Sequence, residues 1–535
     1  MSISTGRYPT ETLPSAAEGW TLQRLTAPSR LFGANGLRTG PDGRIYVAQV
    51  SGSQISAIDI ANGQIETISA KGSDIIAPDD IAFDANGNLF ATEVMDSRVS
   101  MRSKDGRTRI LRDDLPSANG ITVHQGRLFV GECRIGGRIM ELDLNGGAPR
   151  VLASDVPMPN AMEVGPDGLL YYPVMGTNEI WRINPEGGAP EKVAGDLGVP
   201  DSVKFDAEGY IVSTQVASGQ VLRINPRNGE RTVLAQLEPG LDNLTFVGER
   251  LFVSNFNGQI SEVTSNGTTR TLLPHGFNGP FDITVDSSGK IYVADGPNLF
   301  QLLADGTTKS LGMLFTPGYP GYTRGLAATG DGELIVATAA GQIARYRPAL
   351  NESEVLAQGL DQLYGVAVTS SGAVITAELG TGRVLAIKSD NVEVLAANLR
   401  DPLGIAIDAN DAILVSESAG GRVVRVLGSG VETVVDGLQN PQGILVRDGL
   451  LYIVDVGAKT VIEYDLKKGG RRIIASTLPV GAPPGVVAKP LRGFPPFTGP
   501  MGPYAGIAAG ADGTLYISAN GDGSVLALKV AAARG

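Results

Sequence analysis

The chain has 535 residues, with 44 Lys and Arg against 56 Asp and Glu, and therefore a formal net charge of −12. This length exceeds what one ordinary hydrophobic core supports, so two domains or an array of repeats is expected. The negative charge argues against nucleic acid and anionic membranes as partners. One cysteine and two histidines exclude an internal disulfide, a multi-cysteine zinc site and a histidine-rich metal centre.

The start of the chain and its glycine content give two further expectations. Residues 1–20 have no basic start followed by an apolar run, and no apolar stretch of about 18 residues occurs, which predicts a cytoplasmic protein. The 71 glycines and 32 prolines have no collagen-like period, so they indicate many short elements joined by tight turns. The glycine and proline content favours an all-β fold.

One unit recurs along the chain: an apolar strand, an Asp-Gly or Asn-Gly type of turn, a second apolar strand ending in a polar residue, and two further strands. Its twelve copies start at Asn35, Asp79, Asn119, Asn160, Asp201, Asp242, Phe281, Arg324, Tyr364, Leu403, Gln442 and Ala505. Their spacing is 39 to 44 residues, except for 63 before the last copy. Four strands per period of this length are typical of propeller blades. We predict two tandem six-bladed β-propellers with twelve four-stranded blades, because twelve blades in one ring would leave a very wide hole.

Outer strands decide how each ring closes. A candidate at Trp20–Thr26 precedes the first unit, and others follow each unit except the last, as at Arg107–Arg112, Glu230–Ala235 and Thr269–Leu273. In the simplest closure, Trp20–Thr26 completes the sixth blade and Thr269–Leu273 the twelfth, which removes the free edge of each ring. A swapped closure, in which the N-terminal strand completes the last blade, satisfies the same count.

With the simplest closure, the domains are an N-terminal tail at 1–18, a first propeller at 19–266 and a second propeller at 267–535. The second propeller is expected to have a structural or substrate-shaping role. Two long loops rich in Pro, Gly and aromatic residues, Leu311–Arg324 and Leu478–Tyr504, are expected to fill the interface between the propellers rather than to form a lid.

The first residues of the repeat units lie where each innermost strand enters the central channel, so they form a ring at its mouth. All six first-propeller members carry a side-chain oxygen: Asn35, Asp79, Asn119, Asn160, Asp201 and Asp242. The second-propeller ring is Phe281, Arg324, Tyr364, Leu403, Gln442 and Ala505. Asn and Asp are also favoured where a chain enters a strand from a tight turn, but that preference would place them in both rings. The difference therefore predicts a functional site in the first propeller.

Carboxylates and amides without thiols or imidazoles suit a hard cation. We predict a divalent metal ion at this ring, Ca²⁺ first, with Mg²⁺, Mn²⁺ or Zn²⁺ as alternatives. A cation would also let several acids share one channel without protonation. Ends of the second strands add polar side chains near the same mouth: Gln49, Glu93, Glu132, Gln215 and Asn255.

The segments Asn160–Tyr172 and Pro200–Val212 resemble the metal-bearing blades of the gluconolactonase, regucalcin and diisopropyl fluorophosphatase superfamily of six-bladed propellers, a likeness that covers roughly residues 30–260. In that family an acid from the first blade, an asparagine from the fourth and an aspartate from the fifth hold the metal, and a third-blade asparagine contacts metal or substrate. By position, the resemblance implies Asn160 and Asp201 as ligands and Asn119 as the third-blade contact.

This sequence departs from the family pattern at the first blade, where Asn35 replaces the acid. Either Asp79, Asp242 or Glu93 restores the missing charge, or the metal is bound less tightly. The second half resembles NHL-repeat and gluconolactonase-like propellers more distantly, through patterns such as Pro441–Ile444 and Leu451–Asp455.

The resemblance implies an enzyme, a metal-dependent hydrolase of the lactonase or esterase type, in which Asp201 is the general base. Glu93 and Glu132 are further acid or base candidates, and Asn35, Asn119 and Phe256 are expected substrate contacts. Aromatic and methionine residues near the mouth suggest a small organic substrate that is bulkier and less polar than a sugar lactone. The alternatives are a lyase or isomerase that uses the same site, and a non-enzymatic binding platform.

Cys133 follows Glu132 at the predicted mouth. A small buried side chain is the commoner role for such a cysteine, and no histidine partner is in view for nucleophilic catalysis. We therefore expect a structural cysteine.

Overall fold

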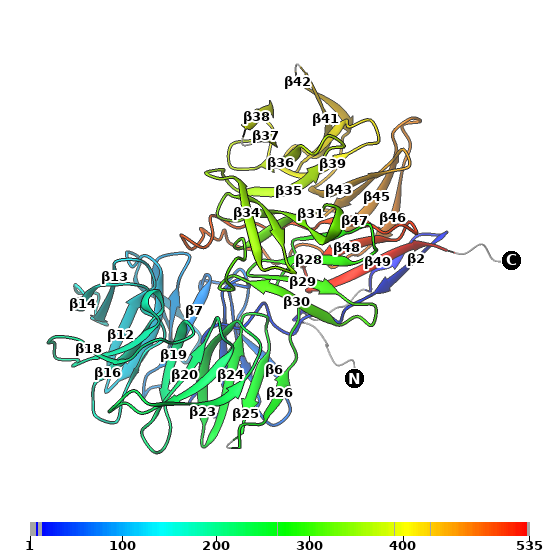
Figure 1. Ribbon diagram of the computed structural model, residues 1–535. Coiled ribbons are helices and arrows are strands. Elements are labelled where there is room, and N and C mark those ends of the chain that lie inside the picture. The colour runs from blue at the N-terminus through cyan, green and yellow to red at the C-terminus, as the bar shows by residue number, and fades with distance from the viewer. Residues whose placement is uncertain (1–6, 9–12, 265, 390, 429, 532–535) are drawn as a thin grey trace. The chain divides into compact units, whose positions relative to one another are not determined.

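The computed structural model describes residues 7–8, 13–264, 266–389, 391–428 and 430–531. This part of the chain is built from strands, with two short 3₁₀ turns, η1 (Met175–Thr177) and η2 (Gly330–Gly332), and contains no α-helix. The strands form twelve sheets, eleven of four strands and one of five (Figure 1). The prediction of an all-β fold with two six-bladed propellers is confirmed.

In the first propeller, each of six sheets uses four strands that follow one another in the chain, ordered from β3–β6 to β23–β26. These strands are Leu37–Thr39 (β3), Ile45–Gln49 (β4), Gln54–Ile58 (β5), Ile65–Ser69 (β6), Pro78–Phe83 (β7), Leu89–Glu93 (β8), Arg98–Arg102 (β9), Thr108–Arg112 (β10), Ala118–His124 (β11), Arg127–Glu132 (β12), Gly137–Leu142 (β13), Arg150–Val156 (β14), Glu163–Val164 (β15), Leu170–Val174 (β16), Glu179–Ile183 (β17), Glu191–Ala194 (β18), Pro200–Phe205 (β19), Ile211–Gln215 (β20), Gln220–Ile224 (β21), Arg231–Gln236 (β22), Leu241–Val247 (β23), Arg250–Asn255 (β24), Ile260–Val263 (β25) and Thr269–Leu273 (β26).

The second propeller adds two N-terminal strands to the remaining ones. Its strands are Ser15–Ala16 (β1), Trp20–Arg24 (β2), Asp282–Val285 (β27), Ile291–Asp295 (β28), Asn298–Leu302 (β29), Thr308–Met313 (β30), Thr323–Ala328 (β31), Leu334–Thr338 (β32), Ile343–Arg347 (β33), Glu352–Ala357 (β34), Leu363–Val368 (β35), Val374–Glu378 (β36), Arg383–Lys388 (β37), Asn391–Ala396 (β38), Pro402–Ile407 (β39), Ile413–Glu417 (β40), Arg422–Leu427 (β41), Gly430–Val435 (β42), Pro441–Arg447 (β43), Leu450–Asp455 (β44), Thr460–Asp465 (β45), Arg471–Ser476 (β46), Ile507–Ala509 (β47), Leu515–Ala519 (β48) and Ser524–Val530 (β49).

Burial differs between the strands of a blade. The second strands, such as β8 and β32, are buried at every residue because both sheet faces pack against neighbouring blades. The outer strands, such as β22, keep most residues exposed. The short apolar runs of the sequence therefore correspond to the second strands, and the polar strands lie at the rim.

Glycines next to the ring let the innermost strands approach each other closely. A Cβ atom on Gly36 would lie 2.4 Å from the carbonyl oxygen of Asp79, and one on Gly325 would lie 2.0 Å from that of Tyr364. Such distances leave no room for a side chain. Where a glycine follows the ring residue, as at Gly36 and Gly325, the close packing of the innermost strands requires it.

The closure of the rings follows the swapped arrangement, so the simplest closure is wrong. Strand β2 pairs antiparallel with β49 and completes the twelfth blade, where the N-terminal and C-terminal strands run side by side in Figure 1. Strand β26 pairs with β25 and completes the sixth blade through a short local hairpin. Counting outer strands could not separate these arrangements because both use the same number.

The domain boundaries shift accordingly. One compact unit comprises residues 30–276 with 486–494, and the other comprises 1–29, 277–485 and 495–535. The predicted boundaries at residues 19 and 267 therefore assign both β2 and β26 to the wrong propeller. The long loop 478–504 is divided between the two units, and its predicted role at the interface stays a prediction.

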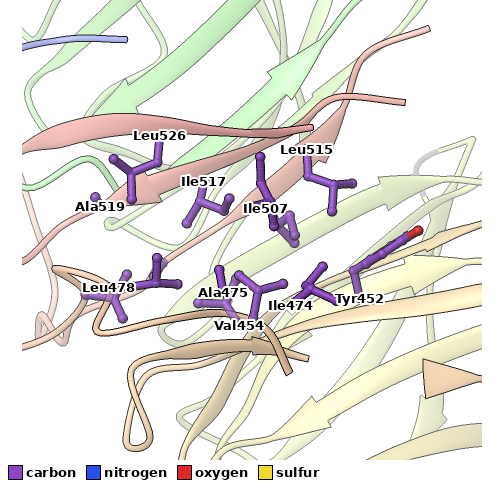
Figure 2. Close-up of a cluster of buried hydrophobic side chains, with 14 of the residues drawn as sticks. Tyr452, Val454, Ile474, Ala475, Leu478, Ile507, Leu515, Ile517, Ala519 and Leu526 are labelled. Carbon is purple, nitrogen blue, oxygen red and sulfur yellow. The ribbon is translucent and has the colours of Figure 1, made fainter. Parts of the chain in front are cut away.

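Apolar packing explains why β2 belongs to the second propeller. Trp20 is 7% exposed and meets the ring of Tyr452 edge to face, with 6.5 Å between the ring centroids. Both belong to a core cluster between the eleventh and twelfth blades, whose members from β44, β46 and β48 point toward one another in Figure 2. Burial of a tryptophan here stabilises the blade to which β2 is added.

No helix within the described residues is long and apolar enough to cross a membrane.

Candidate functional site at the mouth of the first propeller

The six predicted ring residues lie at the entries to the six innermost strands of the first propeller. Asp79, Asn119, Asp201 and Asp242 lie within β7, β11, β19 and β23, whereas Asn35 and Asn160 come just before β3 and β15. Five of them are less than a tenth exposed, and Asn35 is half-buried. The repeat pattern thus predicted correctly where the ring residues lie on the blades.

Each aspartate of the ring has an asparagine neighbour from the adjacent blade. Asn160 Nδ2 donates to Asp201 Oδ2 at 2.9 Å, and Asn35 Nδ2 donates to Asp242 Oδ2 at 3.1 Å. A side-chain hydrogen bond from Asn119 lowers the pKa of Asp79. Six blades therefore supply three Asn–Asp pairs, and the carboxylates are held by neutral amides rather than by cations.

The three carboxylates are electrostatically uncompensated. Burial is the main cause that raises the pKa of Asp79, Asp201 and Asp242, and the neighbouring aspartates raise each of them further. None of the three forms a salt bridge within the described part of the chain. Buried carboxylates without a counter-charge are costly unless they are protonated or bind a cation.

A second layer of charged residues lies further along the same strands. Arg38 Nη1 lies 2.7 Å from Glu163 Oε2, and Lys204 Nζ lies 3.0 Å from the same oxygen. Burial raises the pKa of Asp80, while Arg38 and Lys204 lower it. Two cations and two anions thus balance in this layer, unlike in the ring at the mouth.

Sequence reasoning missed this second layer. Arg38, Glu163 and Lys204 each lie three positions after a ring residue. A register shift between Pro200 and Val203 interrupts the alternation of side chains, so a period of two does not identify the third position as facing the channel. The sequence does contain a pattern that could have revealed this layer. Charged residues occur at this position in the first six repeats, at Arg38, Glu163 and Lys204.

Glu93 and Glu132, the predicted acid or base candidates, are occupied by other partners. Glu93 accepts the backbone N–H of Ile76 at 2.6 Å and forms a salt bridge with Arg98. Glu132 accepts Arg138 Nε at 2.8 Å.

The equivalent glutamates of the second propeller have the same partners. Glu378 accepts the backbone N–H of Asp361 at 2.9 Å and Arg383 Nε at 2.6 Å, and Glu417 accepts the backbone N–H of Arg400 at 2.7 Å. Because this arrangement recurs where the mouth ring lacks acids, we assign Glu93 and Glu132 to the blade scaffold.

Other predicted mouth residues divide into scaffold and lining. Gln49 Oε1 and Gln215 Oε1 accept backbone N–H groups of Phe32 and Gly198, so they fill the position that glutamate occupies elsewhere. Phe256, an expected substrate contact, follows β24 and is half-buried, with its backbone N–H bonded to Gly240 O at 2.8 Å.

Two sulfur side chains line the ring. Met175 Sδ accepts Asn160 Nδ2 at 3.1 Å. Burial raises the pKa of the Cys133 thiol, Asp201 and Asp79 raise it further, and a hydrogen bond with Asn119 lowers it. Cys133 is therefore a buried neutral thiol beside the carboxylates.

The donor set at the mouth fits a hard cation with mixed ligands. Within the described residues, no group of three or more His, Cys, Asp and Glu side chains is arranged to hold a metal ion. Amide oxygens would therefore have to supply part of the coordination. Asn119 Oδ1 is buried and has no hydrogen-bond partner, which is a free oxygen of the required kind beside Asp79.

Comparisons with known proteins give a family match for one propeller and distant structural matches. A gluconolactonase from Xanthomonas campestris is 18% identical, with a TM-score of 0.38, over 45% of this chain and 92% of that chain. A virginiamycin B lyase from Staphylococcus aureus is 19% identical, with a TM-score of 0.39, over 52% and 96%. A comparison with curated proteins found no significant match.

The family model that matches is described as the SMP-30/Gluconolactonase/LRE-like region, and the match covers residues 21–256. It begins within β2, ends in the sixth blade, and leaves the rest of the second propeller outside. The first propeller thus matches the gluconolactonase-like family, and the resemblance predicted from Asn160–Tyr172 and Pro200–Val212 is confirmed.

Proposed function

We propose that the first propeller is a metal-dependent hydrolase of the lactonase or esterase type, with its active site at the mouth ring. The observation that carries the proposal is the set of three buried, uncompensated aspartates, each with an asparagine from the next blade. The match of residues 21–256 to the SMP-30/gluconolactonase/LRE-like family supports the reaction class.

Asn160 and Asp201 would hold the cation, and Asn119 Oδ1, Asp79 or Asp242 would complete the ligands, with Ca²⁺ as the first candidate. A hard divalent cation at this position would supply polarisation of a lactone or ester carbonyl and acidification of bound water. Its charge would also favour the ionised form of the three aspartates, since an adjacent cation stabilises carboxylates.

The side chains of the chain supply proton transfer and orientation. Asp201 would accept the proton of the attacking water, as the family resemblance implies, since only one of its two oxygens is bonded to Asn160. Asn160 fixes the rotamer of Asp201 through its 2.9 Å hydrogen bond. Met175 and Cys133 supply apolar walls that would limit water and favour a substrate with an apolar body.

Metal analysis and a hydrolysis assay in ¹⁸O water test this function together. We expect the purified protein to contain a stoichiometric divalent metal, to lose lactone or ester hydrolysis after chelation, and to regain it with Ca²⁺. The product acid should carry ¹⁸O from water. Product without ¹⁸O would indicate the lyase or isomerase alternative, and full activity in metal-free protein would contradict the proposal.

A further inference from the structure

The mouth of the second propeller contains a buried cation without a counter-ion. Arg324 occupies the ring position at the start of β31 and is 0% exposed. It forms no salt bridge with any residue that the structure describes, and its Nε and Nη1 atoms are buried without hydrogen-bond partners. Buried guanidinium groups are normally paired, because their desolvation is costly.

The other groups around Arg324 are aromatic rings and backbone. Its guanidinium carbon lies 4.7 Å from the ring centroid of Tyr364, and Nη2 donates to the carbonyl oxygen of Pro500. Tyr364 in turn packs against Tyr504, with 5.8 Å between the ring centroids. Contact with an aromatic face lowers the cost of burying the guanidinium, but it provides no hydrogen-bond acceptor for the N–H groups of Nε and Nη1.

Asp282 is one candidate for a counter-ion, because it accepts the backbone N–H of Leu326, two residues after Arg324. Burial raises the pKa of Asp282 to about 7, and only backbone hydrogen bonds lower it. The guanidinium of Arg324 is not among the groups that lower this pKa. In the first propeller, by contrast, the half-buried channel arginine Arg38 is paired with Glu163.

A segment of the long loop, Gly499–Tyr504, which we call the strap, closes this mouth. Gly499 N donates to Ala339 O at 2.9 Å, and Gly502 N donates to the hydroxyl of Tyr364 at 2.9 Å. Tyr504 also borders a channel cavity of about 290 Å³ that is lined largely by small and apolar side chains of the innermost strands. The strap thus covers the guanidinium of Arg324 and the ring of Tyr364, and its own Tyr504 borders the apolar cavity.

We propose that the second propeller binds a small organic carboxylate at this mouth, with Arg324 as the residue that recognises its anionic group. The carboxylate accepts a hydrogen bond from Nε or from Nη1, the two donor atoms without a partner, and a flat apolar body packs against Tyr364 and Tyr504. The strap carbonyl of Pro500 occupies the remaining guanidinium nitrogen. This site is independent of the function proposed for the first propeller.

Calorimetric titration with benzoate tests the proposal, with benzamide as the uncharged isostere and inorganic phosphate as an anion without an apolar body. We expect saturable benzoate binding to the native protein and none of benzamide or phosphate at the same concentrations. Arg324→Gln should weaken benzoate binding at least tenfold. Arg345→Gln, which removes an arginine of the same blade that pairs with Glu354, should leave it unchanged.

No benzoate binding by the native protein, equal binding of benzamide, or unchanged binding by a folded Arg324→Gln variant would each overturn the proposal. If Arg324→Gln does not fold, crystals of the native protein with 4-bromobenzoate decide the question. The anomalous signal of bromine should place the ligand against Arg324 and Tyr364. A ligand bound elsewhere, or none, would also overturn the site.

Discussion

The central channels of the two propellers carry different side chains at the same blade positions. At the mouth, the first channel has three aspartates and three asparagines, whereas the second has one arginine and one glutamine among aromatic and aliphatic residues. Three residues further along, the first channel has Arg38, Glu163 and Lys204, and the second has only Thr284, Ala327, Ala367, Ala406, Leu445 and Ala508. The first channel is therefore filled by a charged network, and the second contains the cavity of about 290 Å³.

This difference separates scaffold from function. Features present in both propellers, such as the glycine after the ring residue and the glutamate–arginine pairs at Glu93 and Glu378, follow from blade packing. Features present in one propeller alone need another explanation. The acidic mouth suits a cation and the arginine mouth suits an anion, so the duplicated fold offers two sites of opposite charge.

The largest expected effect is on catalysis at the first mouth. Asp201→Asn should lower kcat/KM for the hydrolysed ester or lactone by about 10²–10⁴-fold, because it removes the general base. Asp206→Asn, which changes an aspartate at the far end of the same strand that pairs with Arg223, is the control and should stay within about threefold of the native protein. Equal losses in both variants would mean that the effect is structural.

Removal of Trp20 tests which propeller the N-terminal strand completes. Trp20→Ala should lower the stability of the second propeller by about 3–5 kcal/mol, because it empties the core between the eleventh and twelfth blades. The chain has two tryptophans, so Trp181 in β17 remains as a fluorescent reporter of the first propeller. Its unfolding transition should not shift, while the calorimetric transition of the second propeller should. An early Trp181 transition would contradict the swapped closure.

The pH dependence of stability distinguishes the two channels further. Burial raises the pKa of Asp282 from 3.8 to about 7, so the folded state holds this proton more tightly than the unfolded chain. The resulting stability is fully present below pH 4 and is lost as the pH rises through about 7.

Comparison with Asp282→Asn isolates this contribution. The free energy of unfolding of the native protein minus that of the variant should fall by at most roughly 4 kcal/mol between pH 4 and pH 8. The control Asp305→Asn changes an exposed turn aspartate and should show no such fall. If the stability difference between the native protein and Asp282→Asn did not change with pH, a nearby cation would have to hold the pKa of Asp282 down. Arg38 and Lys204 lower the pKa of Asp80 in this way.

The blades and the mouth ring could be predicted from the sequence. The closure of the rings and the side chains that fill the first channel could not. Repetition at a fixed spacing predicts each blade locally, so Asn160 and Asp201 could be assigned to neighbouring blades and are 2.9 Å apart through their side chains. The partner of β2 is a long-range choice that depends on Trp20 packing against Tyr452. The sequence reasoning did not foresee that Glu93 pairs with Arg98 five residues later, a spacing that recurs at Glu378 and Arg383.

The smallest expected effect concerns that shared pair. Glu93→Gln removes the buried carboxylate that pairs with Arg98, and Glu378→Gln removes its equivalent in the second propeller. Each should cost about 1–3 kcal/mol of stability, because a buried donor loses its charged acceptor. If both are scaffold, kcat/KM should remain within about threefold of native in the two variants once folded protein is counted. A loss of 100-fold or more in Glu93→Gln alone, at equal stability, would place Glu93 in the reaction, and the contrast between the propellers would then extend beyond the mouth ring.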